Sequence, residues 1–98
     1  MTNRIRIEIR FFGQLRDTVG RKIIEFDVEN GTTLDRMFDE LLEEYPPLTG
    51  YLADTEARSS SLVVMKNGTH VQHLNESDPV LDDGDTVTLS TSVAGGVT

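Results

Sequence analysis

The strongest constraint on the fold of this 98-residue chain is a change in the spacing of its apolar residues at Asn30-Gly31. Before this dipeptide, apolar and charged residues alternate over residues 4–11 and 23–29, which is the pattern of half-buried strands. After it, six apolar residues recur at helical spacing: Leu34, Met37, Phe38, Leu41, Leu42 and Tyr45. This switch of period favours an α+β fold, in which one helix packs across a sheet.

Turn-forming residues mark where the predicted elements begin and end. Residues 13–21 are predicted to form a loop that joins the first two strands into an antiparallel hairpin. Thr32 or Thr33 can cap the helix, and Pro46-Pro47 ends it because proline lacks the amide hydrogen that another turn would need. Residues 48–61 are predicted to be irregular.

The second half of the chain predicts further strands. An apolar run precedes Asn67-Gly68, a dipeptide typical of two-residue hairpin turns, and Val71 continues the returning strand. Asp83-Gly84 predicts another turn, after which Val87 and Leu89 alternate with polar residues and face inward. The sequence therefore predicts a mixed sheet of four to five strands with one main helix.

Composition and charge exclude several classes of function. The chain has no cysteine, which excludes disulfides and thiolate chemistry and suits a reducing cytoplasm. No apolar run approaches the length of about 18 residues that a membrane-spanning helix needs, so we expect a cytoplasmic protein without membrane association. Residues 1–22 carry a net charge of +4 and residues 23–98 one of −12. This acidic balance argues against binding to nucleic acid.

Few residues could carry chemistry. His70 and His73 would point to opposite faces of a strand and have no third ligand nearby, so no metal site is predicted. The run Asp82 to Asp85 lacks the ligand spacing of a calcium loop and is predicted to be a turn. There is no Gly-x-Ser-x-Gly motif and no glycine-rich phosphate loop. We therefore predict that the protein is not an enzyme and binds no cofactor.

The residues after Leu89, "STSVAGGVT", are small and uncharged. We expect a domain over residues 1–90 and a flexible tail over residues 91–98. Glycine is common at flexible chain ends, so Gly95-Gly96 could be present without any function. In the functional alternative, a thin tail enters the active site of another protein, where glycines let the backbone approach closely.

The chain resembles the MoaD/ThiS family of ubiquitin-like sulfur carriers and the small archaeal modifier proteins related to them. Three stretches carry the resemblance: "FFGQLRDTVG" (residues 11–20), "GTTLDRMFDELLEEYPPL" (residues 31–48) and "LDDGDTVTLSTSVAGG" (residues 81–96). The resemblance implies a β-grasp, or ubiquitin-like, fold. In that fold the first and last strands are parallel neighbours, and the tail leaves from a central strand.

The resemblance also implies a mechanism. A ubiquitin-activating-type enzyme would use ATP and magnesium to adenylate the carboxylate of Gly96, and we expect it to recognise Ala94 and Gly95. The adenylate would then give a thiocarboxylate for a sulfur-accepting enzyme, or an isopeptide bond to a lysine of a target protein. Catalysis would belong to the partner, and the protein is expected to be a monomer.

Two departures from the family pattern matter. Val97-Thr98 follows Gly96, so a peptidase would have to cleave between Gly96 and Val97 before activation. Ser90, Thr91 and Ser92 replace the Phe-Pro-Pro stretch that many small subunits of molybdopterin synthase carry. Phe12 matches an aromatic that the family uses at a partner surface, although it could instead anchor a loop in the core. A non-covalent β-grasp binding module and a molybdopterin synthase small subunit remain alternatives.

Overall fold

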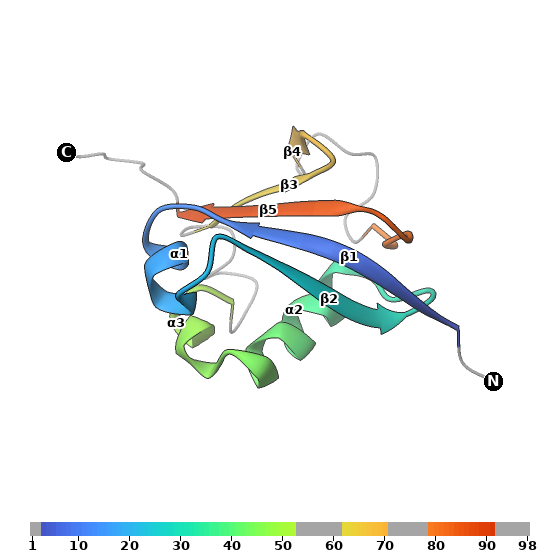
Figure 1. Ribbon diagram of the computed structural model, residues 1–98, viewed down its shortest axis with the longest axis horizontal. Coiled ribbons are helices and arrows are strands. Elements are labelled where there is room, and N and C mark those ends of the chain that lie inside the picture. The colour runs from blue at the N-terminus through green and yellow to red at the C-terminus, as the bar shows by residue number, and fades with distance from the viewer. Residues whose placement is uncertain (1–2, 53–61, 71–78, 92–98) are drawn as a thin grey trace.

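The structure is a computed structural model that describes residues 3–52, 62–70 and 79–91. These residues form a mixed five-stranded sheet in the order β2-β1-β5-β3-β4, with the helices on one face (Figure 1). The elements are β1 (Arg4–Phe11), α1 (Gln14–Val19), β2 (Ile23–Glu29), α2 (Leu34–Glu44), the 3-10 helix η1 (Pro46–Leu48), α3 (Thr49–Leu52), β3 (Leu62–Lys66), β4 (Thr69–His70) and β5 (Thr86–Thr91). The predicted α+β architecture is confirmed.

The first hairpin follows the alternation of its sequence. β1 and β2 are antiparallel, and the apolar residues of β1 lie buried while its arginines lie exposed. β5 then pairs in parallel with β1, with Glu8 opposite Thr86 and Phe11 opposite Leu89. Val87 and Leu89 are fully buried, as predicted. The parallel pairing places the chain's first and last described strands side by side in the sheet.

The second hairpin turns at Asn67-Gly68. Asn67 has φ 52° and Gly68 has φ 86°, and a two-residue turn with positive φ at both positions matches the twist of the strands that it joins. β3 pairs with β4 on one side and with β5 on the other. Val71, which was predicted to continue the returning strand, lies outside the described residues.

The main helix has the predicted cap and buried stripe. The Thr33 side chain accepts a hydrogen bond from the Arg36 amide over 3.3 Å, and Leu34, Met37, Phe38 and Leu41 are buried. The helix begins beside the segment that leads to β5, because the Leu34 amide donates to Pro79 and the Leu81 amide donates to Thr32. The first turn of the helix is therefore fixed to the segment that leads into β5.

Two predicted loops contain helices. Residues 13–21 include α1, whose Leu15 is buried and whose end is set by Gly20 at φ 83°. From Pro46 the chain forms η1 and then α3, so residues 48–52 are helical where an irregular segment over residues 48–61 was predicted. Proline is suited to the first turn of a helix, so the same pair ends α2 and begins η1. Burial of Leu48 then anchors this turn in the core.

None of the helices in the described ranges is both long and apolar enough to cross a bilayer. The boundary expected after residue 90 falls within β5, whose last residue is Thr91. Residues 92–98 lie outside the described residues, so the separate tail stays a prediction.

Candidate functional site

The candidate site begins where β5 ends. β5 has partners on both sides: Thr91 is the register partner of Leu62 in β3, and the Phe12 amide, just after β1, donates to the Leu89 carbonyl over 2.9 Å. The last described residue before the Gly-Gly segment therefore belongs to an interior strand of the sheet. A segment that continues from such a strand starts from a fixed position and direction.

The face of the sheet opposite the helices carries few charges near this end of β5, where the Arg10 side chain, between Ile23 and Thr88, is paired with Glu8. Side chains of residues that pair across a sheet lie on the same face, so Val63 lies beside Ser90, and Met65 lies beside Thr88. Ile23, the partner of Arg10, is 41% exposed. Phe12 follows Arg10 by two residues and is 40% exposed, so it is not a core anchor. Its role at a partner surface stays a prediction.

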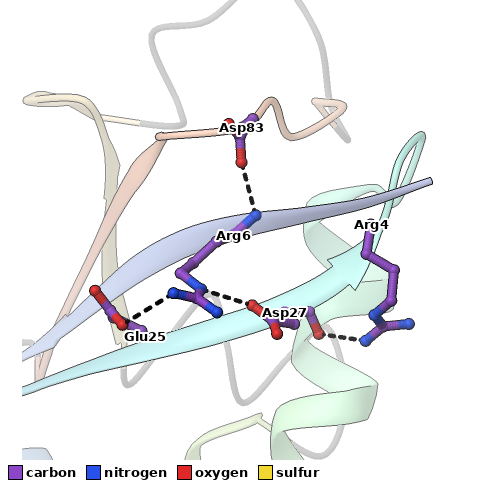
Figure 2. A network of polar contacts seen from close by, with 5 residues as sticks. All are labelled: Arg4, Arg6, Glu25, Asp27 and Asp83. Carbon is purple, nitrogen blue, oxygen red and sulfur yellow. Dashed lines mark hydrogen bonds and ion pairs between the residues drawn. The ribbon is translucent and has the colours of Figure 1, made fainter.

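The other end of this open face is charged. The Arg6 guanidinium contacts Asp27 at 3.0 Å and Glu25 at 3.5 Å, while its backbone amide donates to the Asp83 carboxylate over 2.8 Å (Figure 2). The hydrogen bond to Asp27 and the charges of Asp27 and Glu25 raise the pKa of Arg6 above its ordinary value. This network crosses from β2 through β1 to the turn before β5. It joins elements that are far apart in the sequence.

A buried carboxylate fixes the start of β5. Asp85 is 8% exposed, and its side chain accepts hydrogen bonds from the Asn67 amide group over 2.9 Å and the Asp82 backbone amide over 2.8 Å. Lys66 lies 3.5 Å from the same carboxylate. Burial alone would raise the pKa of Asp85, but these hydrogen bonds and the Lys66 charge outweigh it and hold the pKa below its ordinary value.

Sequence reasoning assigned the run of Asp82 to Asp85 to a turn and missed this connection. Asn67 also accepts a hydrogen bond from the Thr86 amide over 2.8 Å, so one side chain joins the β3–β4 turn to the first residue of β5. The signal in the sequence was the presence of two turn motifs with short polar side chains. Only the fold shows that these turns lie together.

The predicted site residues Ala94, Gly95, Gly96 and Val97 lie outside the described residues. The candidate ligand His73 does so as well, and in the described part of the chain no group of three or more histidine, aspartate or glutamate residues is placed to hold a metal ion. The described arrangement supplies an interior strand, a surface beside it with few charges and an exposed aromatic. Such an arrangement can present a peptide segment to a partner protein.

Comparisons with known proteins agree with this arrangement. The ThiS family profile matches residues 9–96. The chain is 37% identical over 92 residues to small archaeal modifier protein 3 of Haloferax volcanii, which covers 94% of this chain and all of that protein.

Solved structures support the same fold. The solution structure of the Haloferax volcanii HVO 2177 protein superposes with a TM-score of 0.78 at 35% identity, over 95% of this chain and 88% of that one. Small archaeal modifier protein 1 of Methanosarcina acetivorans has a TM-score of 0.76 at 20% identity, over 96% and 99% of the two chains, and supports the fold alone. The expected β-grasp fold is confirmed.

Proposed function

The chain belongs to the ThiS family of ubiquitin-like modifiers and sulfur carriers, and on that premise we propose that its Gly96 carboxylate is activated by a partner enzyme and then transferred. The observation that carries this proposal is the position of β5. It is an interior strand that pairs with β1 up to Leu89 and with β3 up to Thr91, and Gly96 follows Thr91 by five residues. Five residues span at most about 17 Å.

This separation suits a reaction in the active site of another protein. A domain with a fixed sheet can dock on the partner's surface while a short segment of small residues enters a narrow channel. Glycine at positions 95 and 96 leaves no Cβ to obstruct that channel. The region with few charges around Phe12 lies beside the same strand end and would supply part of the docking surface.

The proposed chemistry has two steps. A Gly96 carboxylate oxygen attacks the α-phosphorus of ATP on the partner enzyme, so that an acyl-adenylate forms and pyrophosphate leaves. A sulfide nucleophile then attacks the acyl carbon to give a thiocarboxylate, or a lysine amine attacks to give an isopeptide bond. In either case AMP leaves, and the nucleophile loses its proton. The partner holds the magnesium and ATP, and this chain provides the carboxylate.

Activation requires a free carboxylate, and Val97 follows Gly96 in the sequence. The Gly96 carbonyl is therefore part of a peptide bond, which is a poor nucleophile toward phosphorus. We propose that a peptidase hydrolyses this bond first. The test compares a chain that ends at Gly96, the 98-residue chain, and both forms without Gly96, each incubated with the activating enzyme, ATP and magnesium. Pyrophosphate exchange and intact mass are the measurements.

The chain ending at Gly96 should support pyrophosphate exchange, and the 98-residue chain should do so only after a peptidase removes Val97-Thr98. Deletion of Gly96 should abolish exchange in both forms. Activation of the 98-residue chain with Val97-Thr98 still present by mass would contradict the processing step. Absence of exchange with every form would contradict the activation itself and favour a non-covalent module.

A separate measurement distinguishes a modifier from a sulfur carrier. The chain has no lysine or arginine after Lys66, so trypsin would leave residues 67–96 on a modified lysine. A protease that cleaves after alanine would cut after Ala94 and leave only Gly-Gly. Gly-Gly remnants on cellular lysines would show protein modification. An intact chain in which sulfur replaces one carboxylate oxygen would show sulfur transfer.

A further inference from the structure

In the described part of the chain, β2 forms one outer edge of the sheet and β4 the other (Figure 1). Two hydrogen bonds continue the β1–β2 ladder beyond its ends, from the Phe11 amide to Lys22 and from the Asn30 amide to Asn3. Bonded pairs alternate in an antiparallel ladder. Ile24, Phe26 and Val28 therefore turn their backbone groups toward β1, whereas Ile23, Glu25 and Asp27 turn theirs outward.

A groove lies between this outer edge and the main helix. Its volume is about 560 Å³, and it is lined from β2 by residues that include Ile24 and Phe26, and from the α2 side by residues that include Glu43, Glu44 and Tyr45. Phe26 and Tyr45 are partly buried against the core and form a small apolar floor within a mostly polar groove. Outward backbone groups beside an apolar floor match the way an extended peptide binds to a sheet edge.

The charge around the groove selects the kind of peptide. Glu43 and Glu44 are exposed on α2. Glu25 and Asp27 are exposed on β2, where their carboxylates already contact Arg6. The basic residue that lines the groove is Arg4, whose guanidinium donates to the Asp27 carbonyl over 2.8 Å (Figure 2). The outward groups of Ile23 and Glu25 and the outward amide of Asp27 have no hydrogen-bond partner among the described residues. The groove is thus acidic, with a hydrogen-bonding edge at its side.

We infer that this groove binds a partner protein through an extended segment in which apolar residues alternate with lysine or arginine. The segment would add a strand to β2 and place its apolar side chains over Phe26 and Tyr45. Its basic side chains would point to the opposite face, near Glu25 and Asp27, while Glu43 and Glu44 would attract the positively charged segment from the helix side. β1 separates β2 from β5, so this site lies apart from the strand that leads to Gly96. Binding here goes beyond the proposed activation and does not require it.

The backbone part of the inference can be tested at Glu25. Its amide points away from β1, so Glu25→Pro removes an outward donor and leaves the β1–β2 ladder intact. Glu25→Ala removes the same carboxylate but keeps the amide, and it is the matched control. The probe is a fluorescein-labelled peptide of alternating valine and lysine, and fluorescence anisotropy measures its binding to the full chain. Binding to Glu25→Pro should be about tenfold weaker than binding to Glu25→Ala.

The contribution of charge to peptide binding is tested by replacing one exposed acidic residue inside the groove, and one outside it, with lysine. Glu43→Lys should weaken binding about threefold to tenfold, and Asp17→Lys on α1 should change it less than twofold. A peptide of the same composition with a central proline should bind at least tenfold more weakly. Equal binding of both peptides, or equal effects of the two reversals, would overturn the inference because it would indicate only attraction to an acidic protein.

Hydrogen exchange of the unmodified chain gives a readout that does not depend on a proline variant folding. The amides of Glu25 and Asp27 should exchange more slowly when the peptide is bound, while the Phe26 amide is already held in the ladder. Protection confined to Thr88 and Met65 on the open face would overturn the inference and place the peptide elsewhere. Because activation of Gly96 is measured separately, failure here would leave the proposed function standing.

Discussion

At the scale of single residues, Asp85 connects three separate parts of the fold, and no motif in the sequence indicated these contacts. Its carboxylate joins the β3–β4 turn to the turn before β5, and its backbone carbonyl accepts from the Glu8 amide over 2.9 Å. A lowered pKa in the folded state means that the unfolded chain binds a proton at higher pH. The stability from ionised Asp85 is therefore fully present above its ordinary pKa of about 3.9 and is lost as the pH falls through the folded pKa.

This linkage predicts a pH-dependent effect of Asp85→Asn. At pH 7 the substitution should lower the free energy of unfolding by about 1–3 kcal/mol, because it removes a charged acceptor from a buried set of hydrogen bonds. The difference from the unmodified protein should shrink below about pH 4. Urea melts at both pH values measure it, with the exposed Asp17→Asn as control. A difference that stays constant between pH 7 and pH 3 would contradict the lowered pKa.

Phe12 allows a second prediction at the residue scale. Phe12→Ala should weaken association with the activating enzyme at least fivefold, because exposed aromatics at interface centres often contribute more than about 1 kcal/mol. The side chain is 40% exposed, so the loss of stability should stay below about 1 kcal/mol. Val80→Ala is the matched control, since Val80 is 44% exposed and lies beside Thr33 at the start of α2. Equal effects on association would show that Phe12 has no special role.

At the scale of elements, the buried stripe of α2 holds the helix against the sheet. Leu41 is fully buried, whereas the Glu40 side chain is 33% exposed and lies 3.6 Å from Arg36. Leu41→Ala should cost about 2–5 kcal/mol of unfolding free energy because it leaves a cavity in the core. Glu40→Ala should cost less than about 0.5 kcal/mol, as expected for an exposed ion pair. Urea melts of the two variants compare them, and similar costs would be inconsistent with this orientation of the helix.

At the scale of the whole molecule, the net charge of −8 should make stability depend on salt. Excess negative charge repels itself in the compact state. Raising NaCl from about 0.1 M to about 1 M shortens the screening length from about 10 Å to about 3 Å. We therefore expect the melting temperature to rise by several degrees, despite weaker ion pairs around Arg6.

A variant with reduced charge separates repulsion from other effects of salt. Glu43→Lys combined with Glu44→Lys changes the net charge from −8 to −4 and should respond less to NaCl. Thermal melts followed by circular dichroism compare the two proteins. If salt lowers the melting temperature of the unmodified chain, the ion pairs of Arg6 stabilise the fold by more than the charge repulsion destabilises it.

The sequence alone determined the elements whose periodicity is regular. Alternation from Arg4 to Phe11 and the stripe from Leu34 to Tyr45 specify which faces are buried, because a strand repeats every two residues and a helix every 3.6. Asn67-Gly68 specified its turn for a local reason, since few residues adopt positive φ. Two further predictions came from the resemblance to a known family, which is carried by residues 11–20, 31–48 and 81–96. These were the parallel pairing of the first and last strands and the activation of Gly96.

Only the tertiary structure decided what distant segments do together. α1 and η1 are too short for their periodicity to be recognised, and they are held by the burial of Leu15 and Leu48 against the core. The contacts of Asp85 with Asn67, and the outward edge of β2 beside α2, join residues from separate parts of the sequence. Local patterns report only the face that a residue prefers, whereas the partner on that face is set by how the elements pack.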